Sequence, residues 1–322
     1  MLEEESISAV QEEQQVLETG ISAGEETEME NRHHGRYKPV FKTEEQIEAD
    51  EAESAAERAA KKAAEEEAEA LENVVGDYGF YIDGQPAPLE TARTMRGSLT
   101  YVALAPTVKA FVPDAQVSWN STGKTVTVKT PLMTMTAKVG EQYIEANGRY
   151  LYIQDGVEME DSRVVVPLSV LAKAFDVSIT WDSATKTIYA TRGSGAIQSG
   201  DEFYAEDALF WLSRVIHAEA GNQPMKGRMA VANVVLNRVA NPHFPNNIVD
   251  VLSQRNQFTT YQGGKLVNRE PNEKSVIATK LVLDGGVVEE TRGALYFDSK
   301  RSSWASRNKE LLAVIGGHSF YR

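Results

Sequence analysis

A diverged internal repeat constrains the fold of this chain more than any other feature. The segments YVALAPTVKAFVPDAQVSWNSTGKTVTV, from Tyr101, and VVPLSVLAKAFDVSITWDSATKTIYA, from Val165, share Lys-Ala-Phe, a later tryptophan and a Lys-Thr pair. Their Lys-Ala-Phe motifs lie 64 residues apart and their tryptophans 62 apart, so the first copy carries two extra residues. Each copy predicts a strand, a short helix and a β-hairpin.

The region around the repeat, residues 77–192, is rich in short alternating runs bounded by Gly, Asp, Asn and Ser, and it predicts a β-rich domain. It resembles the copper amine oxidase N-terminal-like, or stalk, domain family, an accessory module of bacterial envelope proteins. No histidine lies between Tyr78 and Arg192, which excludes imidazole ligation of copper within the domain. We interpret it as a non-catalytic module that contacts the wall or a partner. A pure spacer is the alternative.

The N-terminal part of the chain differs sharply in composition. Residues 1–76 hold 22 acidic and 7 basic side chains, a net charge of −15, which leaves +1 for the remainder. We expect a disordered acidic tail over 1–42 and a charged helical spacer over 43–76. The remainder shows no basic stripe of the kind that nucleic-acid binding requires.

Other global features narrow the chemistry. The chain has no cysteine, so disulfides and thiolate nucleophiles are excluded and catalysis depends on oxygen or imidazole groups. It has no run of 18 apolar residues, and its first 30 residues lack the order of a secretory signal. An exported form would therefore have to be already trimmed. Residues 193–203, rich in Gly and Ser, predict a linker to the last domain, 204–322.

A carboxylate continues an apolar helical stripe at the start of that last domain. A helix is predicted from Tyr204, with Leu212, Val215 and Ile216 on one face and Glu219 next along that face. Gly221 indicates the helix end, so Glu219 lies in the last turn. Burial and the negative end of the helix dipole both favour a raised pKa, as a proton donor requires. The alternative is a glutamate that reaches solvent from a frayed helix end.

The surrounding motifs resemble the spore-cortex-lytic cell wall hydrolase family of the SleB type. They are VIHAEAGNQPMKGRMAVANVVLNRV, FPNNIVDVLSQRNQF, GALYF and IGGHSFY, in this order over about 120 residues. The resemblance implies that Glu219 is the catalytic acid. Two segments depart from the family pattern: TTYQGGKL after Phe258 and DSK after Phe297. These differences bear on the shape of the sugar subsites.

The resemblance implies a mainly helical, lysozyme-like or lytic transglycosylase-like domain with a small β region, and the whole chain is expected to be α+β and multidomain. The patterns themselves agree. They predict helices from Pro224, over NNIVDVLSQ and over PNEKSVIATKLVLDGG, a strand at GALYFDS, and two strands around the Gly-Gly turn of LLAVIGGHSFYR.

The predicted function is peptidoglycan cleavage by a cell wall hydrolase. Because only one carboxylate stands out, a lytic transglycosylase or muramidase acting after N-acetylmuramic acid is favoured over a two-carboxylate glycosidase. Glu219 would act first as acid and then as base toward the sugar's 6-hydroxyl. Four residues are candidates for binding the glycan: Gln257, Tyr261, Tyr296 and His318. No metal or cofactor is predicted.

Two alternatives remain open. A zinc N-acetylmuramoyl-L-alanine amidase would use His217, His318 and a carboxylate, although ligands two apart on a helix diverge. A non-catalytic envelope-binding adaptor would only dock. In every case we expect an extracytoplasmic protein of the wall or spore envelope, with peptidoglycan as partner and, through the accessory domain, envelope or spore-coat proteins. The sequence does not distinguish spore cortex, and thus germination, from vegetative wall.

Overall fold

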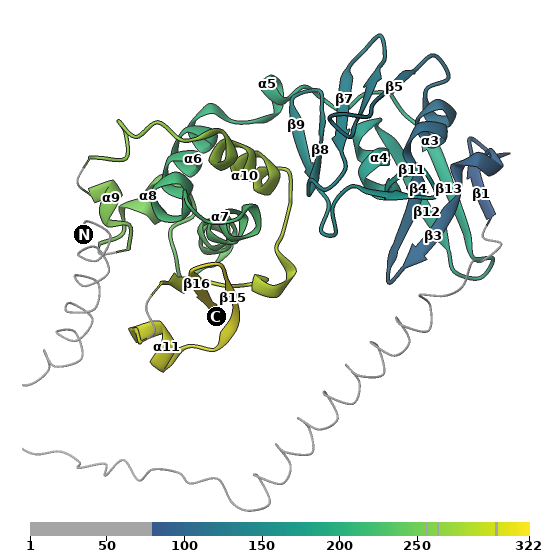
Figure 1. Ribbon diagram of the computed structural model, residues 1–322. Coiled ribbons are helices and arrows are strands. Elements are labelled where there is room, and N and C mark those ends of the chain that lie inside the picture. Colours follow the sequence, from purple (N-terminus) through teal and green to yellow (C-terminus); the bar gives the residue numbers. More distant parts are fainter. Residues whose placement is uncertain (1–78, 256, 263, 300–301) are drawn as a thin grey trace, which may run out of the picture.

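The structure is a computed structural model that describes residues 79–255, 257–262, 264–299 and 302–322. The predicted acidic tail and helical spacer lie outside these residues. The described chain forms a β-rich repeat domain and a mainly helical domain, which lie next to each other in Figure 1. This arrangement confirms the α+β class predicted from the sequence.

The two repeat copies adopt the predicted order of strand, short helix and hairpin. The first copy comprises β4 (Leu99–Ala103), α3 (Leu104–Phe111), β5 (Gln116–Asn120) and β6 (Thr125–Lys129). The second comprises β11 (Arg163–Pro167), α4 (Leu168–Ala174), β12 (Val177–Asp182) and β13 (Thr187–Arg192). The two extra residues of the first copy lie in the connection between its helix and hairpin. The antiparallel pairing of β4 with β11 joins the two copies.

The hairpin turns of the two copies match in backbone detail. Lys124 and Lys186 each adopt a positive φ, 48° and 49°, in the turn between the paired strands. Asn120 Oδ1 accepts from the amide of Gly123 at 2.9 Å, and Asp182 Oδ1 accepts from the amide of the equivalent residue, Thr185, at 3.3 Å. An Asx side chain thus shapes both turns in the same way, which supports the repeat inferred from the sequence.

Three sheets build the repeat domain from Gly79 onward, where the described residues begin. Their strand orders are β5-β6-β7-β8-β9, β10-β11-β4-β3 and β12-β13-β1-β2. The first strand of the domain, β1, pairs in parallel with its last, β13, from Gly79 opposite Thr187 to Ile82 opposite Ala190. The remaining elements are β1 (Gly79–Ile82), β2 (Gln85–Pro86), η1 (Leu89–Thr91), β3 (Arg93–Arg96), β7 (Thr134–Lys138), β8 (Tyr143–Ala146), β9 (Arg149–Tyr152) and β10 (Glu158–Glu160).

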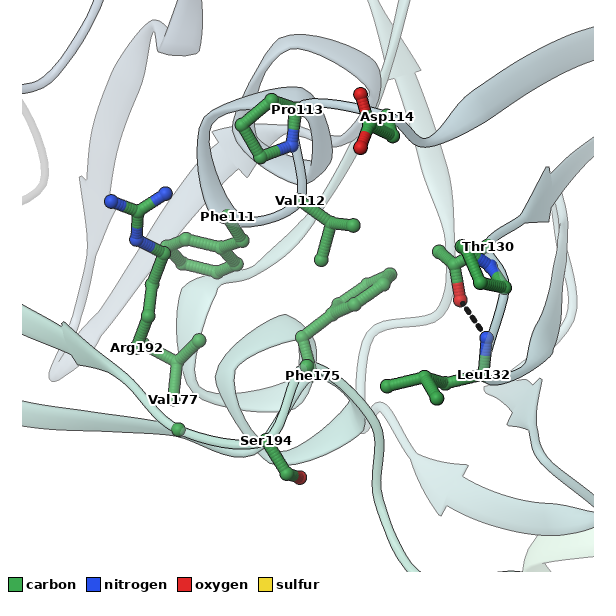
Figure 2. Close-up of a pocket in the computed structure, with 13 residues that line it drawn as sticks. Phe111, Val112, Pro113, Asp114, Thr130, Leu132, Phe175, Val177, Arg192 and Ser194 are labelled. Atoms are coloured by element: carbon green, nitrogen blue, oxygen red, sulfur yellow. Dashed lines mark hydrogen bonds between the residues drawn. The ribbon is translucent and has the colours of Figure 1, made fainter.

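A hollow of about 420 Å³ lies between the two copies. Figure 2 shows it lined by Phe111 and Phe175, the equivalent phenylalanines of the two Lys-Ala-Phe motifs, and by Leu132. Among its charged residues, Arg192 pairs with Asp83. The hollow is mostly apolar and is lined by the repeat domain and by residues 193–195 of the linker, so no residue of the helical domain lines it.

The described part of the helical domain contains the elements predicted for it and, in addition, three short α-helices and one 3-10 helix. The elements are α5 (Gly200–Phe203), α6 (Glu206–Ala220), α7 (Met225–Ala240), α8 (Ile248–Ser253), α9 (Thr259–Gln262), α10 (Glu273–Leu283), η2 (Glu289–Thr291), β14 (Tyr296–Asp298), α11 (Trp304–Asn308), β15 (Leu311–Ile315) and β16 (His318–Tyr321). Helix α7 is buried on most sides, as its apolar sequence predicts, and the three strands form one sheet in the order β14-β16-β15. Helix α6 begins at Glu206, two residues later than predicted.

Asp284, at the end of α10, joins the two domains. Its side chain is only 1% exposed and accepts hydrogen bonds from Arg149 of β9 and from the hydroxyl of Tyr204. Lys173 of α4 lies 3.3 Å from the same carboxylate and donates to the Asp284 carbonyl at 2.6 Å. Tyr150 and other tyrosines of β8 and β9 pack against the helical core. In Figure 1 these strands face α10.

The segment predicted as a Gly and Ser linker is fixed to the repeat domain rather than free. Ile197 is buried in the repeat-domain core, and its carbonyl accepts from Asn147 Nδ2 at 2.8 Å. The Gly200 amide donates to the carbonyl of Asn147 at 2.8 Å. A Cβ at Gly200 would lie 2.4 Å from the carbonyl oxygen of Gly148. Glycine is needed there because two backbones pack closely.

Candidate active site

Glu219 lies in the last turn of α6, as predicted, at the edge of the helical core. Leu212, Val215 and Ile216 are completely buried on the same helix, whereas Glu219 is half-buried. Thr260 of α9 donates a hydrogen bond from Oγ1 to Glu219 Oε1 at 3.2 Å. The carboxylate is therefore held by a neighbouring element and does not extend from a frayed helix end.

The C-terminus of α6 is closed by donors from two other helices. Arg228 of α7 donates from Nε to the carbonyl of Ala220 at 3.3 Å and from Nη2 to that of Gly221. Asn272, which caps the N-terminus of α10, donates to the Gly221 carbonyl at 3.3 Å. The sequence argument treated this end as an uncompensated negative pole. The structure corrects it, because the guanidinium supplies a positive charge there.

Helix α9 brings a second predicted residue to α6. The ring of Tyr261 packs against that of Trp211, with centroids 5.4 Å apart. Trp211 lies two turns before Glu219 on α6, and Tyr261 follows Thr260 directly. Gln257 is half-buried in the turn that precedes this helix. Gln257 and Tyr261 thus belong to the same short segment as Thr260, whose hydroxyl binds Glu219, and the described contacts place Thr260 and Tyr261 against α6.

Tyr296 belongs to a separate aromatic group around a buried arginine. The guanidinium carbon of Arg238 lies 5.1 to 5.6 Å from the ring centroids of Phe244, Phe258 and Tyr296, and its Nε donates to the Leu295 carbonyl at 2.8 Å. Burial lowers the pKa of Arg238 to about 10. Tyr296 lies at the start of β14 and also packs against Trp304. Its described ring contacts are with these groups rather than with Glu219.

His318 is less accessible than the sequence suggested. It is 7% exposed in β16, and its ring centroid lies 5.5 Å from Phe297 and 6.3 Å from Phe320. Phe297 in turn packs against Phe258, at 6.4 Å. His318 therefore packs on Phe297, and Phe297 packs on Phe258, which precedes Thr260 by two residues.

His217 lies in an unfavourable environment for a cation. Burial, and then the charges of Arg269 and Arg228, lower its pKa below the ordinary value of 6.5. The same positive charges disfavour a bound metal ion. Among the residues that the structure describes, no three His, Asp or Glu side chains cluster in a way that could hold a metal ion.

Sequence reasoning missed two residues with direct roles in this geometry. Thr260 lies in TTYQGGKL, where it was noted only as a departure from the family pattern. Its contact with Glu219 spans 41 residues and leaves no local signal. Arg228 occurs in a helix buried on most sides, where a charged residue calls for a partner. That signal was available, although it does not identify the partner.

Comparison with known proteins confirms both resemblances. Residues 222–321 match the family described as Cell Wall Hydrolase, and residues 71–190 match the family described as Copper amine oxidase N-terminal domain. The first match begins just after Glu219. The assignment of Glu219 as a candidate site residue therefore rests on the HAEA motif and on the geometry described above.

Curated relatives are spore cortex-lytic enzymes. One from Bacillus cereus is 31% identical over 121 residues, which cover 36% of this chain and 45% of the relative. One from Bacillus subtilis (strain 168) is 30% identical over 120 residues, which cover 36% of this chain and 38% of the relative. The chain thus spans less than half the length of these relatives.

Two solved structures are also similar. The catalytic domain of the germination-specific lytic transglycosylase SleB from Bacillus anthracis is 27% identical, with a TM-score of 0.34, and the match covers 39% of this chain and all of that domain. The catalytic domain of the Bacillus cereus SleB protein is 28% identical, with a TM-score of 0.34, and covers 40% of this chain. In the described part of this chain, every helix is too short or too polar to cross a bilayer.

Proposed function

We propose that the helical domain is a peptidoglycan-cleaving glycosidase of the lytic transglycosylase type. The observation that carries the proposal is Glu219, half-buried at the end of an apolar stripe and bound by Thr260. Glu219 protonates the glycosidic oxygen that follows N-acetylmuramic acid. As a carboxylate it then accepts the proton of the sugar's 6-hydroxyl, which attacks the anomeric carbon and leaves a 1,6-anhydro end.

A single carboxylate suffices for this reaction because the nucleophile belongs to the substrate. The acidic side chains on neighbouring elements have structural contacts of their own. Asp298 accepts from the Ser303 hydroxyl, Asp250 contacts Asn247, and Glu270 pairs with Arg214. These engagements support a one-carboxylate mechanism over one with a second catalytic carboxylate.

The groups around Glu219 suit a sugar polymer. Tyr261 and Gln257 lie in the same segment as Thr260 and offer an aromatic ring, a hydroxyl and an amide to a glycan strand. Tyr296 and His318 are proposed to contact the glycan farther from Glu219, or to support the segment 257–262 through Phe258 and Phe297. The matches to spore cortex-lytic enzymes support peptidoglycan as the substrate class and an extracytoplasmic location.

Mass spectrometry of muropeptides released from purified peptidoglycan tests the proposal. We expect anhydromuramic ends from the full chain and none from Glu219→Gln. Reducing ends would indicate hydrolysis, and free stem peptides together with loss of activity in a chelator would indicate a zinc amidase. Binding to peptidoglycan without release of any fragment would identify an adaptor. Cortex that carries muramic-δ-lactam, compared with vegetative wall, then assigns the natural substrate.

A further inference from the structure

Arg228 is a buried cation whose partners are backbone carbonyls. It is 5% exposed and lies in the first half of α7. Among the described residues no carboxylate pairs with it, and its Nη1 has no hydrogen-bond partner. A guanidinium buried in this way is costly unless a compensating negative charge lies nearby.

The compensating charge is the C-terminus of α6. The carbonyls of Ala220 and Gly221 accept from Nε and Nη2 of Arg228, so the planar guanidinium bridges two adjacent carbonyls. The last carbonyls of a helix lack partners within the helix and carry the negative end of its dipole. Arg228 therefore satisfies these groups and neutralises their charge in one contact.

Glu219 directly precedes this closed end. We propose that Arg228 is the positioning residue of Glu219, because it fixes the last turn of α6 and supplies the positive charge of that helix end. The inference rests on the proposed function, in which Glu219 transfers the proton. Asn272 of α10 shares the Gly221 carbonyl but carries no charge, so it contributes to position alone.

Few other charged groups lie near this helix end in the described structure. On α6 itself His217 has a pKa lowered by burial and by Arg269 and Arg228, so it is neutral near pH 7. Arg269, on the segment before α10, is a second cation near this helix end, but it is exposed, and the adjacent Glu270 pairs with Arg214. Helix α9 contributes Thr260, which is uncharged. Arg228 is thus the buried charge that touches the last turn.

The charge of Arg228 and its two hydrogen bonds to the Ala220 and Gly221 carbonyls, here called the fork, lead to separate predictions. A nearby cation favours the carboxylate form of Glu219, so removal of the cation makes the proton leave at higher pH. The cleavage step requires protonated Glu219, and its rate falls as pH rises through that titration. Loss of the charge therefore moves the alkaline limb of the pH–rate profile upward, by about 0.5 to 1 pH unit. Loss of the fork alone lowers kcat and leaves the limb in place.

The experiment measures initial rates of fragment release from solubilised peptidoglycan across the pH range for the full chain and four variants. Arg228→Gln removes the charge but keeps a donor, and Arg228→Lys keeps the charge but loses the fork. Lys226→Met is the matched control. It removes a positive charge from the same helix, but Lys226 pairs with Glu290 and not with the end of α6. Glu219→Gln establishes that the measured rate depends on Glu219.

We expect the alkaline limb to rise in Arg228→Gln and to stay unchanged in Arg228→Lys and Lys226→Met. In both Arg228 variants kcat should fall about tenfold with KM within about twofold. An unshifted limb and a normal kcat in a folded Arg228→Gln would overturn the proposal, as would an equal shift in Lys226→Met. Should Arg228→Gln fail to fold, Arg228→Lys with an unchanged kcat overturns it. Activity that survives in Glu219→Gln would instead refute the proposed function.

Discussion

The carboxylate of Asp284 offers the sharpest test of how the two domains are held together. In Asp284→Asn the side chain keeps its shape but loses its charge. Arg149, whose side chain is only 7% exposed, is then left as a buried cation without a carboxylate, whereas Lys173 is 43% exposed and can turn to solvent. Breaking a buried ion pair from one side costs about 3 to 5 kcal/mol. In a protein of this size that loss lowers Tm by roughly 6 to 20 °C.

Urea denaturation and calorimetry of the full chain measure this effect. Lys173→Met is the matched control, because an exposed ion pair is worth about 0 to 1 kcal/mol and its loss should lower Tm by no more than about 4 °C. We also expect Asp284→Asn to make the segment between Gly200 and α6, which carries Tyr204, more sensitive to proteases as the domains separate. A free energy of unfolding within about 1 kcal/mol of wild type would refute the view that Asp284 joins the domains.

Three further predictions concern the end of α6. Thr260→Val should lower kcat about fivefold or more, because it removes a hydrogen bond to Glu219 worth roughly 1 kcal/mol. Thr260→Ser keeps the hydroxyl and should retain activity. Equal rates in the two variants would contradict the contact with Glu219. Gly221→Ala should lower the free energy of unfolding, measured by urea denaturation, by roughly 1 to 3 kcal/mol, because its Cβ would lie 2.4 Å from the His217 carbonyl oxygen. Substitution of the exposed Asn222 by Ala should leave that free energy unchanged. The lowered pKa of His217 means that the unfolded chain binds a proton at this side chain more readily than the folded chain, so the free energy of unfolding should fall as pH drops below about 6.5. Tm should therefore fall less steeply with decreasing pH in His217→Gln than in wild type. Parallel curves of Tm against pH would argue against a depressed pKa.

Periodicity and turn residues predicted most elements of this fold. The helix that carries Glu219 was visible because Leu212, Val215 and Ile216 repeat at helical spacing, and Gly221 indicated its end. The repeat copies were visible because a strand, a helix and a hairpin each leave a local pattern. These are properties of neighbours in sequence.

Contacts between distant residues were not predictable in this way. Asp284 reads as an ordinary helix end before Gly-Gly, yet its partner Arg149 lies 135 residues earlier. Arg228 looked like one polar residue in an apolar helix, and nothing in its neighbours points to the carbonyls of Ala220 and Gly221. The charge at the end of α6 was misjudged for this reason. A helix pole can be judged only when the groups facing it are known.

The parallel pairing of β1 with β13 has a mechanical consequence. In the described structure β1 begins at Gly79 and β13 ends at Arg192, at opposite ends of two parallel strands. Tension applied to these two ends would pull the strands along their length in opposite directions. All the hydrogen bonds between them would then bear the load together, in shear, instead of opening one by one. The pairing of β1 with β13 is thereby suited to resist a pull between these two ends.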